Sequence, residues 1–152
     1  MTVNVLRDAA RNCVRIFSFL VAEYGFRAPT VSSDSASFTV RFQTDVTGVE
    51  VNYAIRGGLI VWICQLTGGS WPGRPGRITD ESAIRWFDLY DVQAVVEGHP
   101  PVADDLIYAI PSDEILQARA ESLRTDGDSL LRGDFTLVPQ LRARVIARAT
   151  RA

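Results

Sequence analysis

The sequence contains no lysine and very little histidine, cysteine or methionine. All 16 basic residues of the 152-residue chain are arginine, beside one histidine, two cysteines and one methionine. The absence of lysine excludes a lysine Schiff base and the lysine of a phosphate-binding P-loop. One histidine and two separated cysteines, Cys13 and Cys64, give neither a disulfide framework nor a set of zinc ligands. We therefore expect no metal, no cofactor and a location in a reducing cytoplasm.

Long apolar segments are also absent. The longest apolar run near the N-terminus, Ile16 to Ala22, contains a serine and is followed by no convincing cleavage site, so we expect neither a signal peptide nor a membrane span. With 47% hydrophobic and 22% charged residues, the composition is that of an ordinary soluble protein. A chain of this length is most simply one domain, and we expect a single α+β domain over residues 1–152.

The N-terminal part has the pattern of an amphipathic helix. Apolar residues recur at steps of three and four from Leu6 to Tyr24, while arginines line another face. Gly25 follows as the natural left-handed residue beyond a helix end, and Phe26 stands where it can pack back on the helix. The sequence therefore predicts one helix that ends at Tyr24.

The next segments predict an antiparallel meander. Apolar and polar side chains alternate over 38–43 and again over 49–56, which indicates strands with one buried face. The run 59–66 is apolar on both faces apart from one glutamine, as in an inner strand. We expect a further strand around 84–87, and we interpret the serine-rich segment 32–37 as a connector.

Helical patterns fill the C-terminal part. Asp88 can cap a short helix, and Ser112 opens a second one that breaks near 126–128. The last helix is predicted to begin near Thr136, which places Pro139 in its first turn. The predicted fold is thus α+β, with an N-terminal helix, a meander of three to four strands and C-terminal helices packed on the sheet.

Two segments come close to a catalytic motif without completing it. Gly68 to Ser70 follow a predicted strand in the manner of a nucleophile elbow, but Pro72 stands where the motif requires a second glycine. His99 is the only histidine that a serine triad could use as its base. Cys64 lies in an apolar predicted strand, where a thiol is usually inert packing. We expect no catalytic residue and, from the spacing of the carboxylates, no metal site.

Charge is distributed unevenly along the chain. Residues 1–77 carry eight arginines against five acids, and residues 119–152 carry seven against four. Residues 78–117 carry nine acids against one arginine, although the net charge of the whole chain is only −2. Such asymmetry is evidence about partners, and an acidic surface would bind a basic one. The slightly acidic total argues against a nucleic-acid partner.

These acids and one loop aromatic are the predicted partner-binding residues. They are Trp71, Asp80, Glu81, Asp88, Asp91, Glu97, Asp104 and Asp105. In this hypothesis the carboxylates attract a basic protein, and the tryptophan serves as the buried aromatic anchor.

Four stretches in this order carry a family resemblance. They are "FSFLVAEYGF" at 17–26, "VEVNYAIRGGLIVWI" at 49–63, "WFDLYDV" at 86–92 and "LLRGDFTLVPQL" at 130–141. The arrangement resembles a group of small uncharacterised bacterial proteins, frequent in high-GC actinobacteria, some of which look like immunity proteins of polymorphic toxin systems. The resemblance implies a non-enzymatic protein that occludes a basic toxin, and it implies no catalytic residues.

Two other functions remain open from the sequence. A small-molecule-binding or regulatory module would have a pocket between the sheet and its helices, lined by Trp62, Tyr53 and Trp86. An enzyme without a recognisable motif would need convergent polar groups with shifted pKa values. Neither the partner nor the oligomeric state follows from the sequence.

Overall fold

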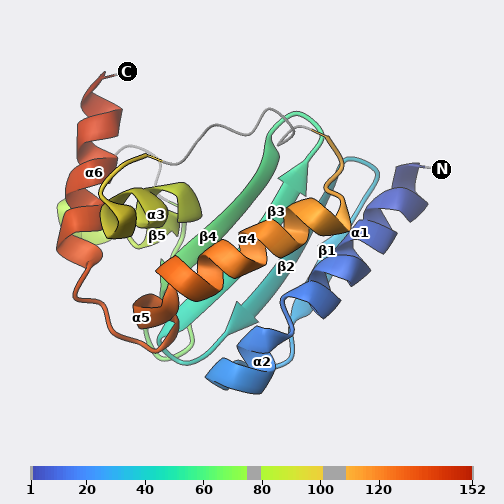
Figure 1. Cartoon of the computed structure of the whole chain (residues 1–152), viewed down its shortest axis with the longest axis horizontal. Coiled ribbons are helices and arrows are strands. Elements are labelled where there is room, and N and C mark those ends of the chain that lie inside the picture. The colour runs from blue at the N-terminus through green and yellow to red at the C-terminus, as the bar shows by residue number, and fades with distance from the viewer. Residues whose placement is uncertain (1, 75–79, 101–108, 152) are drawn as a thin grey trace.

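An N-terminal pair of helices, a five-stranded antiparallel sheet and a set of C-terminal helices follow one another along the chain (Figure 1). The computed structural model describes residues 2–74, 80–100 and 109–151. The helices are α1 (Thr2–Ile16), α2 (Phe19–Tyr24), α3 (Leu89–Glu97), α4 (Asp113–Asp126), α5 (Asp128–Leu131) and α6 (Val138–Arg151), with a short 3-10 helix, η1 (Glu81–Ala83). The strands are β1 (Thr30–Ser33), β2 (Ser37–Gln43), β3 (Thr47–Ala54), β4 (Gly58–Gln65) and β5 (Trp86–Asp88). The predicted α+β fold is confirmed.

The strands pair in the order of the chain, each antiparallel to its neighbour. The predicted strand near 84–87 is β5, which pairs with β4. The sheet has five strands rather than three to four, because β1 overlaps the segment interpreted as a connector. Its sequence, Thr-Val-Ser-Ser, is short and exposed throughout, so no buried face produces an alternating pattern. Segment 30–33 is a strand because it pairs with β2, which its local sequence does not indicate.

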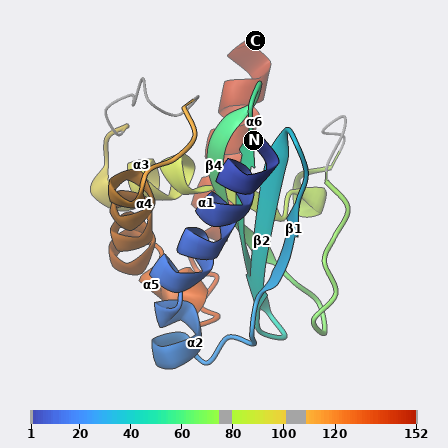
Figure 2. The same ribbon diagram turned by 90° about the vertical axis from the view of Figure 1, so that its right-hand side faces the viewer.

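The helices cover one face of the sheet, and the core lies between them (Figure 2). Alternate side chains of β2 and β3, such as Phe38, Phe42 and Val51, point into this core and are fully buried. From the other side, α1 supplies Leu6, the turn after α1 supplies Phe17, and α4 supplies Leu116 and Leu123. Because side chains on a strand alternate, the polar residues between these core positions lie on the opposite face of the sheet.

The predicted first helix is interrupted. A turn at Phe17 and Ser18 separates α1 from α2, so the expectation of one helix up to Tyr24 is wrong. In a straight helix, positions 17 and 19 would point about 200° apart, yet Phe17 and Phe19 are both buried. The turn reorients the chain so that both rings reach the core. The end of α2 is as predicted, because Gly25 is left-handed, with φ of 73°.

The C-terminal helices begin at the predicted caps. Asp88 accepts a 2.9 Å hydrogen bond from the N–H of Tyr90 at the start of α3, and Ser112 accepts one of 3.3 Å from the N–H of Ile115 in α4. The break near 126–128 separates α4 from α5. The last helix starts at Val138, two residues after the predicted position. None of the helices in the described segments is long and apolar enough to cross a membrane.

Candidate binding site on the open face of the sheet

The face of the sheet opposite the helices carries a cluster of aromatic and charged side chains. All three tryptophans of the chain take part, one from β4, one from β5 and one from the loop that follows β4. We call this cluster the arginine–tryptophan face, and its members are Arg41, Glu50, Trp62, Trp71, Arg74 and Trp86. Figure 2 shows the loop after β4 passing on the side of the sheet away from α1 and α4.

A buried carboxylate fixes the two arginines. Glu50 lies opposite Arg41 in the register of β2 and β3, and the side chain of Glu50 is only 1% exposed. Nε of Arg41 donates a 2.9 Å hydrogen bond to Oε1 of Glu50, and Nη2 of Arg74 donates to Oε2. A buried carboxylate is strongly unfavourable unless it is paired, and here each oxygen has an arginine partner. Glu50 therefore sets the positions of both guanidinium groups.

Each guanidinium also stacks on an indole ring. Cζ of Arg41 lies 4.4 Å from the centroid of the Trp71 ring, and Cζ of Arg74 lies 4.5 Å from that of Trp86. Cations over an indole face are attracted by the ring quadrupole. The ring centroids of Trp71 and Trp86 are 5.6 Å apart, and those of Trp62 and Trp86 are 6.1 Å apart. The cluster is a continuous stack of ring–ring and cation–ring contacts, in which Trp62 meets Trp86 edge to face.

Trp71 is part of this stack rather than a free anchor. Its Nε1 donates a 2.9 Å hydrogen bond to Oε1 of Gln43 in β2, and the side chain is half-buried. The loop is held further by Gln43, whose Nε2 donates to the carbonyl of Gly69 at 2.9 Å. Trp71 therefore holds the loop against the sheet, and its predicted role as the aromatic anchor for a partner stays a prediction.

A cleft of about 420 Å³ opens beside the stack, between the edge strand β1 and the arginines. Its walls are residues 30–32 of β1, Thr39 and Arg41 of β2, and Glu50 and Arg74. Except for one valine, these walls are hydroxyl groups, guanidinium groups and the paired carboxylate. The hydroxyl and guanidinium groups donate hydrogen bonds, and guanidinium forks match carboxylate and phosphate oxygens.

The charge around the cleft is positive. Its lining contains two arginines, Arg41 and Arg74, against the single carboxylate of Glu50. At Cys64, on the same face of the sheet, burial has the largest effect and raises the pKa of the thiol to about 12. The thiol is therefore protonated at neutral pH, in agreement with the predicted packing role.

One of the predicted partner-binding acids, Asp91, is buried in the interior. Asp91 is 1% exposed and forms ion pairs with Nε of Arg144 at 2.9 Å and Nη1 of Arg148 at 2.6 Å. These contacts join α3 to α6. The charge asymmetry of the sequence predicts Asp91 on the partner-binding surface, but it does not reveal the arginines 53 and 57 positions further along the chain that pair with this residue.

The other predicted acids within the described residues differ in burial and in their contacts. Asp80 is exposed and accepts a 3.0 Å hydrogen bond from the N–H of Ser82, with Glu81 exposed beside it. Asp88 is partly buried as the cap of α3, and burial raises the pKa of its carboxyl. Glu97 is exposed and lies near Asp126.

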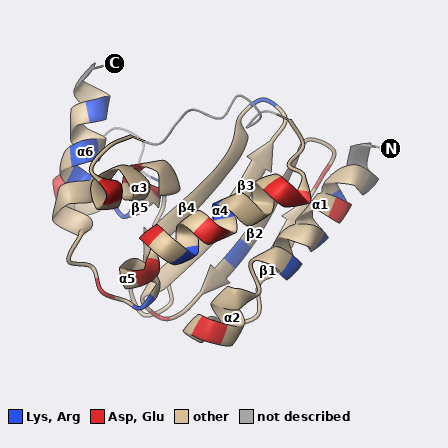
Figure 3. Cartoon of the chain, in the orientation of Figure 1, with Lys and Arg blue, Asp and Glu red and all other residues tan. Residues whose placement is uncertain are grey.

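Asp104 and Asp105 lie outside the described residues. Acidic and basic positions are interspersed over the helices rather than separated onto two sides (Figure 3). The acidic surface for a basic partner stays a prediction.

The predicted pocket between sheet and helices is not formed by its expected residues. Tyr53 lies in the core on the helix side, with its ring centroid 5.9 Å from that of Phe38. Trp62 and Trp86 lie on the opposite face of the sheet. These three side chains cannot line a common pocket, because the sheet separates them.

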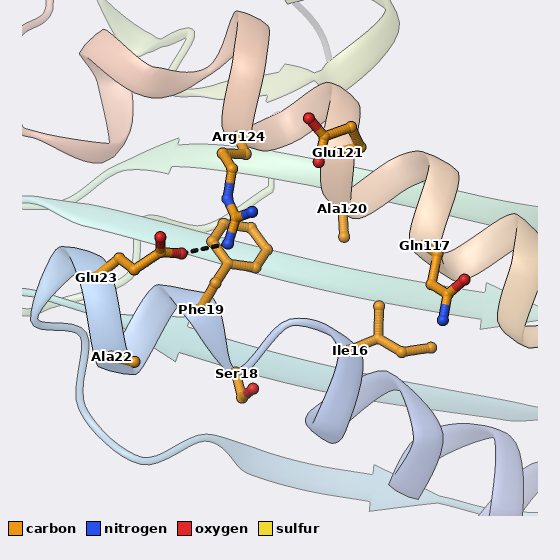
Figure 4. Close-up of a pocket in the computed structure, with 9 residues that line it drawn as sticks. All are labelled: Ile16, Ser18, Phe19, Ala22, Glu23, Gln117, Ala120, Glu121 and Arg124. Atoms are coloured by element: carbon orange, nitrogen blue, oxygen red, sulfur yellow. Dashed lines mark hydrogen bonds and ion pairs between the residues drawn. The ribbon is translucent and has the colours of Figure 1, made fainter.

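A second cleft, of about 430 Å³, lies between α2 and α4 (Figure 4). Arg124 extends from α4 towards α2, where it stacks over Phe19 with its Cζ 4.6 Å from the ring centroid. Arg124 also forms an ion pair with Glu23. Both charged partners are about half-exposed, in contrast to the buried Glu50. The charged groups of the arginine–tryptophan face are thus held more rigidly than those of the second cleft.

Sequence reasoning missed the arginines and Glu50 at this site. One signal was available, because alternation places Arg41 and Glu50 on the polar face of two neighbouring strands. Arg74 and Trp71 come from a loop whose path the local pattern does not define. No group of three or more histidine, cysteine, aspartate or glutamate side chains in the described part of the chain could hold a metal ion.

The comparisons with known proteins identified no relative of this chain. The resemblance to actinobacterial immunity-type proteins, and with it the inhibitor role, stays a prediction. No protein-family model, no curated protein and no solved structure matches the chain.

Proposed function

We propose that the protein is a non-enzymatic binding protein that holds an anionic group in the cleft beside the arginine–tryptophan face. The observation that carries this proposal is the arrangement of Arg41 and Arg74 around the buried Glu50. Two guanidinium groups share one carboxylate, so the cleft keeps a net positive charge. An anion entering it meets donors of the geometry that binds carboxylate and phosphate most strongly.

The arginines are already ordered before any ligand binds. Each is bonded to Glu50 and stacked on an indole, so much of its side-chain entropy has been lost on folding. A ligand then gains the hydrogen bonds without the full entropic cost of fixing two long side chains. A guanidinium has five N–H donors, and the bonds to Glu50 use one from each arginine.

The chemistry of the cleft favours binding over catalysis. Arginine does not lose its proton at any ordinary pH, so it cannot serve as a general acid or base near neutrality. The carboxylate of Glu50 is engaged by both arginines. These groups can hold and orient a charged ligand, and proton transfer would require a further group.

A titration with simple anions tests the proposal. Citrate, glutamate and inorganic phosphate are added separately to ¹⁵N-labelled protein, and the indole N–H signals of the tryptophans are followed by NMR. We expect at least one anion to shift the signals of Trp71 and Trp86 in a saturable way. Arg74→Gln should weaken this binding at least tenfold.

Arg124→Gln is the matched control, because Arg124 is similarly exposed and also stacks on a ring but lies in the other cleft. It should leave the titration unchanged. The proposal is wrong if none of the anions shifts these indole signals, or if the two arginine variants bind equally well.

A further inference from the structure

The edge strand β1 forms one wall of the cleft. Residues 30–33 are all exposed, and the strand pairs with β2 on one side only in the described structure. Residues 30–32 also line the cleft that contains Arg41 and Arg74. The open edge of the sheet and the positive cleft are therefore continuous.

The hydrogen bonds between β1 and β2 show which backbone groups of β1 point away from β2. The N–H of Asp34 bonds to the carbonyl of Ser37 at 3.0 Å, just beyond the strand. Hydrogen-bonded pairs alternate along an antiparallel ladder, so Ser32 and Thr30 direct their backbone groups towards β2. The N–H and C=O groups of Val31 and Ser33 then point to the free edge.

A second hydrogen bond supports the same assignment of inward and outward backbone groups. The N–H of Arg27 bonds to the carbonyl of Gln43 at 2.9 Å, on the side of β2 that faces β1. Because backbone directions repeat every second residue, Arg41 and Thr39 also direct their backbone groups towards β1. The hydrogen bonds at both ends of the β1–β2 hairpin thus indicate that the backbone N–H and C=O groups of Val31 and Ser33 are available to a further strand.

Apart from its short length of four residues, the edge lacks the usual protection against pairing. Natural edge strands are commonly blunted by charged residues, proline or a bulge. Residues 30–33 contain neither a charge nor a proline, and Val31 is 50% exposed. An uncharged, exposed edge beside two fixed arginines is suited to a chain that supplies both backbone partners and a negative charge.

We propose that an extended peptide with an acidic side chain adds to β1 as a sixth strand and places its carboxylate in the cleft near Arg74 and Arg41. This inference rests on the proposed function and specifies its ligand. Strands in a sheet lie about 4.8 Å apart, so a glutamate on the added strand and an arginine on β2 can meet across β1. Backbone pairing supplies affinity, and the charge selects the acidic segment.

A single-stranded nucleic acid fits the same face less well. Aromatic platforms for nucleic acids offer open ring faces on which bases stack. Here the guanidinium groups of Arg41 and Arg74 occupy faces of the Trp71 and Trp86 rings. The chain also has a net charge of −2, whereas nucleic-acid-binding domains are usually basic.

The test uses two defined peptides and the full-length protein. The first is an acetylated and amidated Thr-Val-Glu-Val-Thr peptide, and the second carries Gln in place of Glu. Affinity is measured by NMR titration, with citrate titrated in parallel. We expect the Glu peptide to bind at least tenfold more tightly than the Gln peptide, and Arg74→Gln to abolish that difference.

Strand addition itself is tested by removing one outward N–H group. Ser33→Pro should weaken the Glu peptide at least tenfold and leave citrate binding unchanged, because residue 33 does not line the cleft, while Ser33→Ala should retain both. A Glu peptide with every backbone nitrogen methylated should likewise lose at least tenfold in affinity, and this probe requires no change in the protein.

Each alternative result has a distinct meaning. If the methylated peptide binds as well as the parent, strand addition is wrong, although a citrate site would still support the proposed function. If neither citrate nor the Glu peptide responds to Arg74→Gln, the proposed function fails as well. Tighter binding of a dT10 oligonucleotide than of the Glu peptide would overturn the peptide assignment.

Discussion

Gly48 in β3 lies directly under the indole of Trp71, so close that a Cβ atom at position 48 would lie 2.5 Å from Cη2 of the ring. No side chain fits in that space. The glycine precedes a predicted strand, and its sequence position suggests a turn residue. In the structure it permits the loop after β4 to lie flat on the sheet, which positions Trp71 for Arg41.

Gly48→Ala should therefore displace Trp71 and weaken the arginine–tryptophan face. We expect the free energy of unfolding to fall by about 1–3 kcal/mol, the usual effect of overpacking, with a change in tryptophan fluorescence. Gly57→Ala is the control, because a Cβ atom there would lie 3.5 Å from Cβ of Ala54, an ordinary contact. Equal stability of the two variants in urea unfolding would contradict the close packing at Gly48.

Glu50→Gln should destabilise the protein because it leaves two neighbouring arginines without their shared carboxylate. Removal of one partner from a buried ion pair usually costs about 3–5 kcal/mol, and we expect about 2 kcal/mol here since both arginines are partly exposed. Urea unfolding measures the change. The double variant Arg41→Gln with Glu50→Gln should recover part of the loss, and no recovery would contradict the pairing.

The carboxyl of Asp126 should make the protein less stable as the pH rises. Burial, and then the nearby Glu97, raise the pKa of Asp126 above its usual 3.8. Between the unfolded and folded pKa values the folded state binds more protons, so the free energy of unfolding falls as pH rises through this window. Asp126→Asn should consequently raise the Tm at pH 7, and the gain should disappear below about pH 3.

Asp134 provides a control of opposite sign. Hydrogen bonds from the side chain and the backbone N–H of Thr136 lower the pKa of Asp134, so its contribution to stability is present above its unfolded pKa and is lost as the pH falls through the folded pKa. Asp134→Ala should lower the Tm at pH 7. If the Tm at pH 7 changed in the same direction in Asp126→Asn and Asp134→Ala, the environments assigned to these two carboxyl groups would be wrong.

Tyr24 joins two helices that are far apart in the sequence. Its Oη donates a 2.6 Å hydrogen bond to Oδ1 of Asp128, which links α2 to α5. Burial, followed by this bond, raises the pKa of Tyr24 to about 12. Tyr24→Phe should lower the free energy of unfolding by about 1 kcal/mol.

Asp128→Asn gives an independent readout of the same contact. It removes the negative charge that opposes ionisation, so ultraviolet titration should show Tyr24 ionising at a lower pH than in the unmodified protein. An unchanged titration curve would mean that the hydrogen bond has little influence on the phenol.

Local patterns predicted the elements whose residues repeat with a buried face. Alternation identified β2 and β3, and capping residues such as Ser112 identified helix starts, because these signals lie within a few positions of one another. The polar strand β1 has no such signal. The break before α2 arises because Phe17 and Phe19 both reach the core, which only tertiary packing decides.

The site was harder to predict for a related reason. A count of charges along the chain treats acids as surface groups, yet Asp91 and Glu50 are buried by arginines from other elements. Arg74 reaches Glu50 across 24 positions of sequence, from a loop. Such pairs depend on how the elements meet, and a single sequence carries little information about that.

The order of strand pairing has a consequence for synthesis on the ribosome. Strands β2, β3 and β4 each directly follow the strand with which they pair, so each hairpin can form as soon as its second strand emerges. Helix α4, which covers part of the apolar face, begins only at residue 113. A nascent chain that ends between β4 and α4 therefore displays bare core residues, and this is the stage at which a chaperone would bind it.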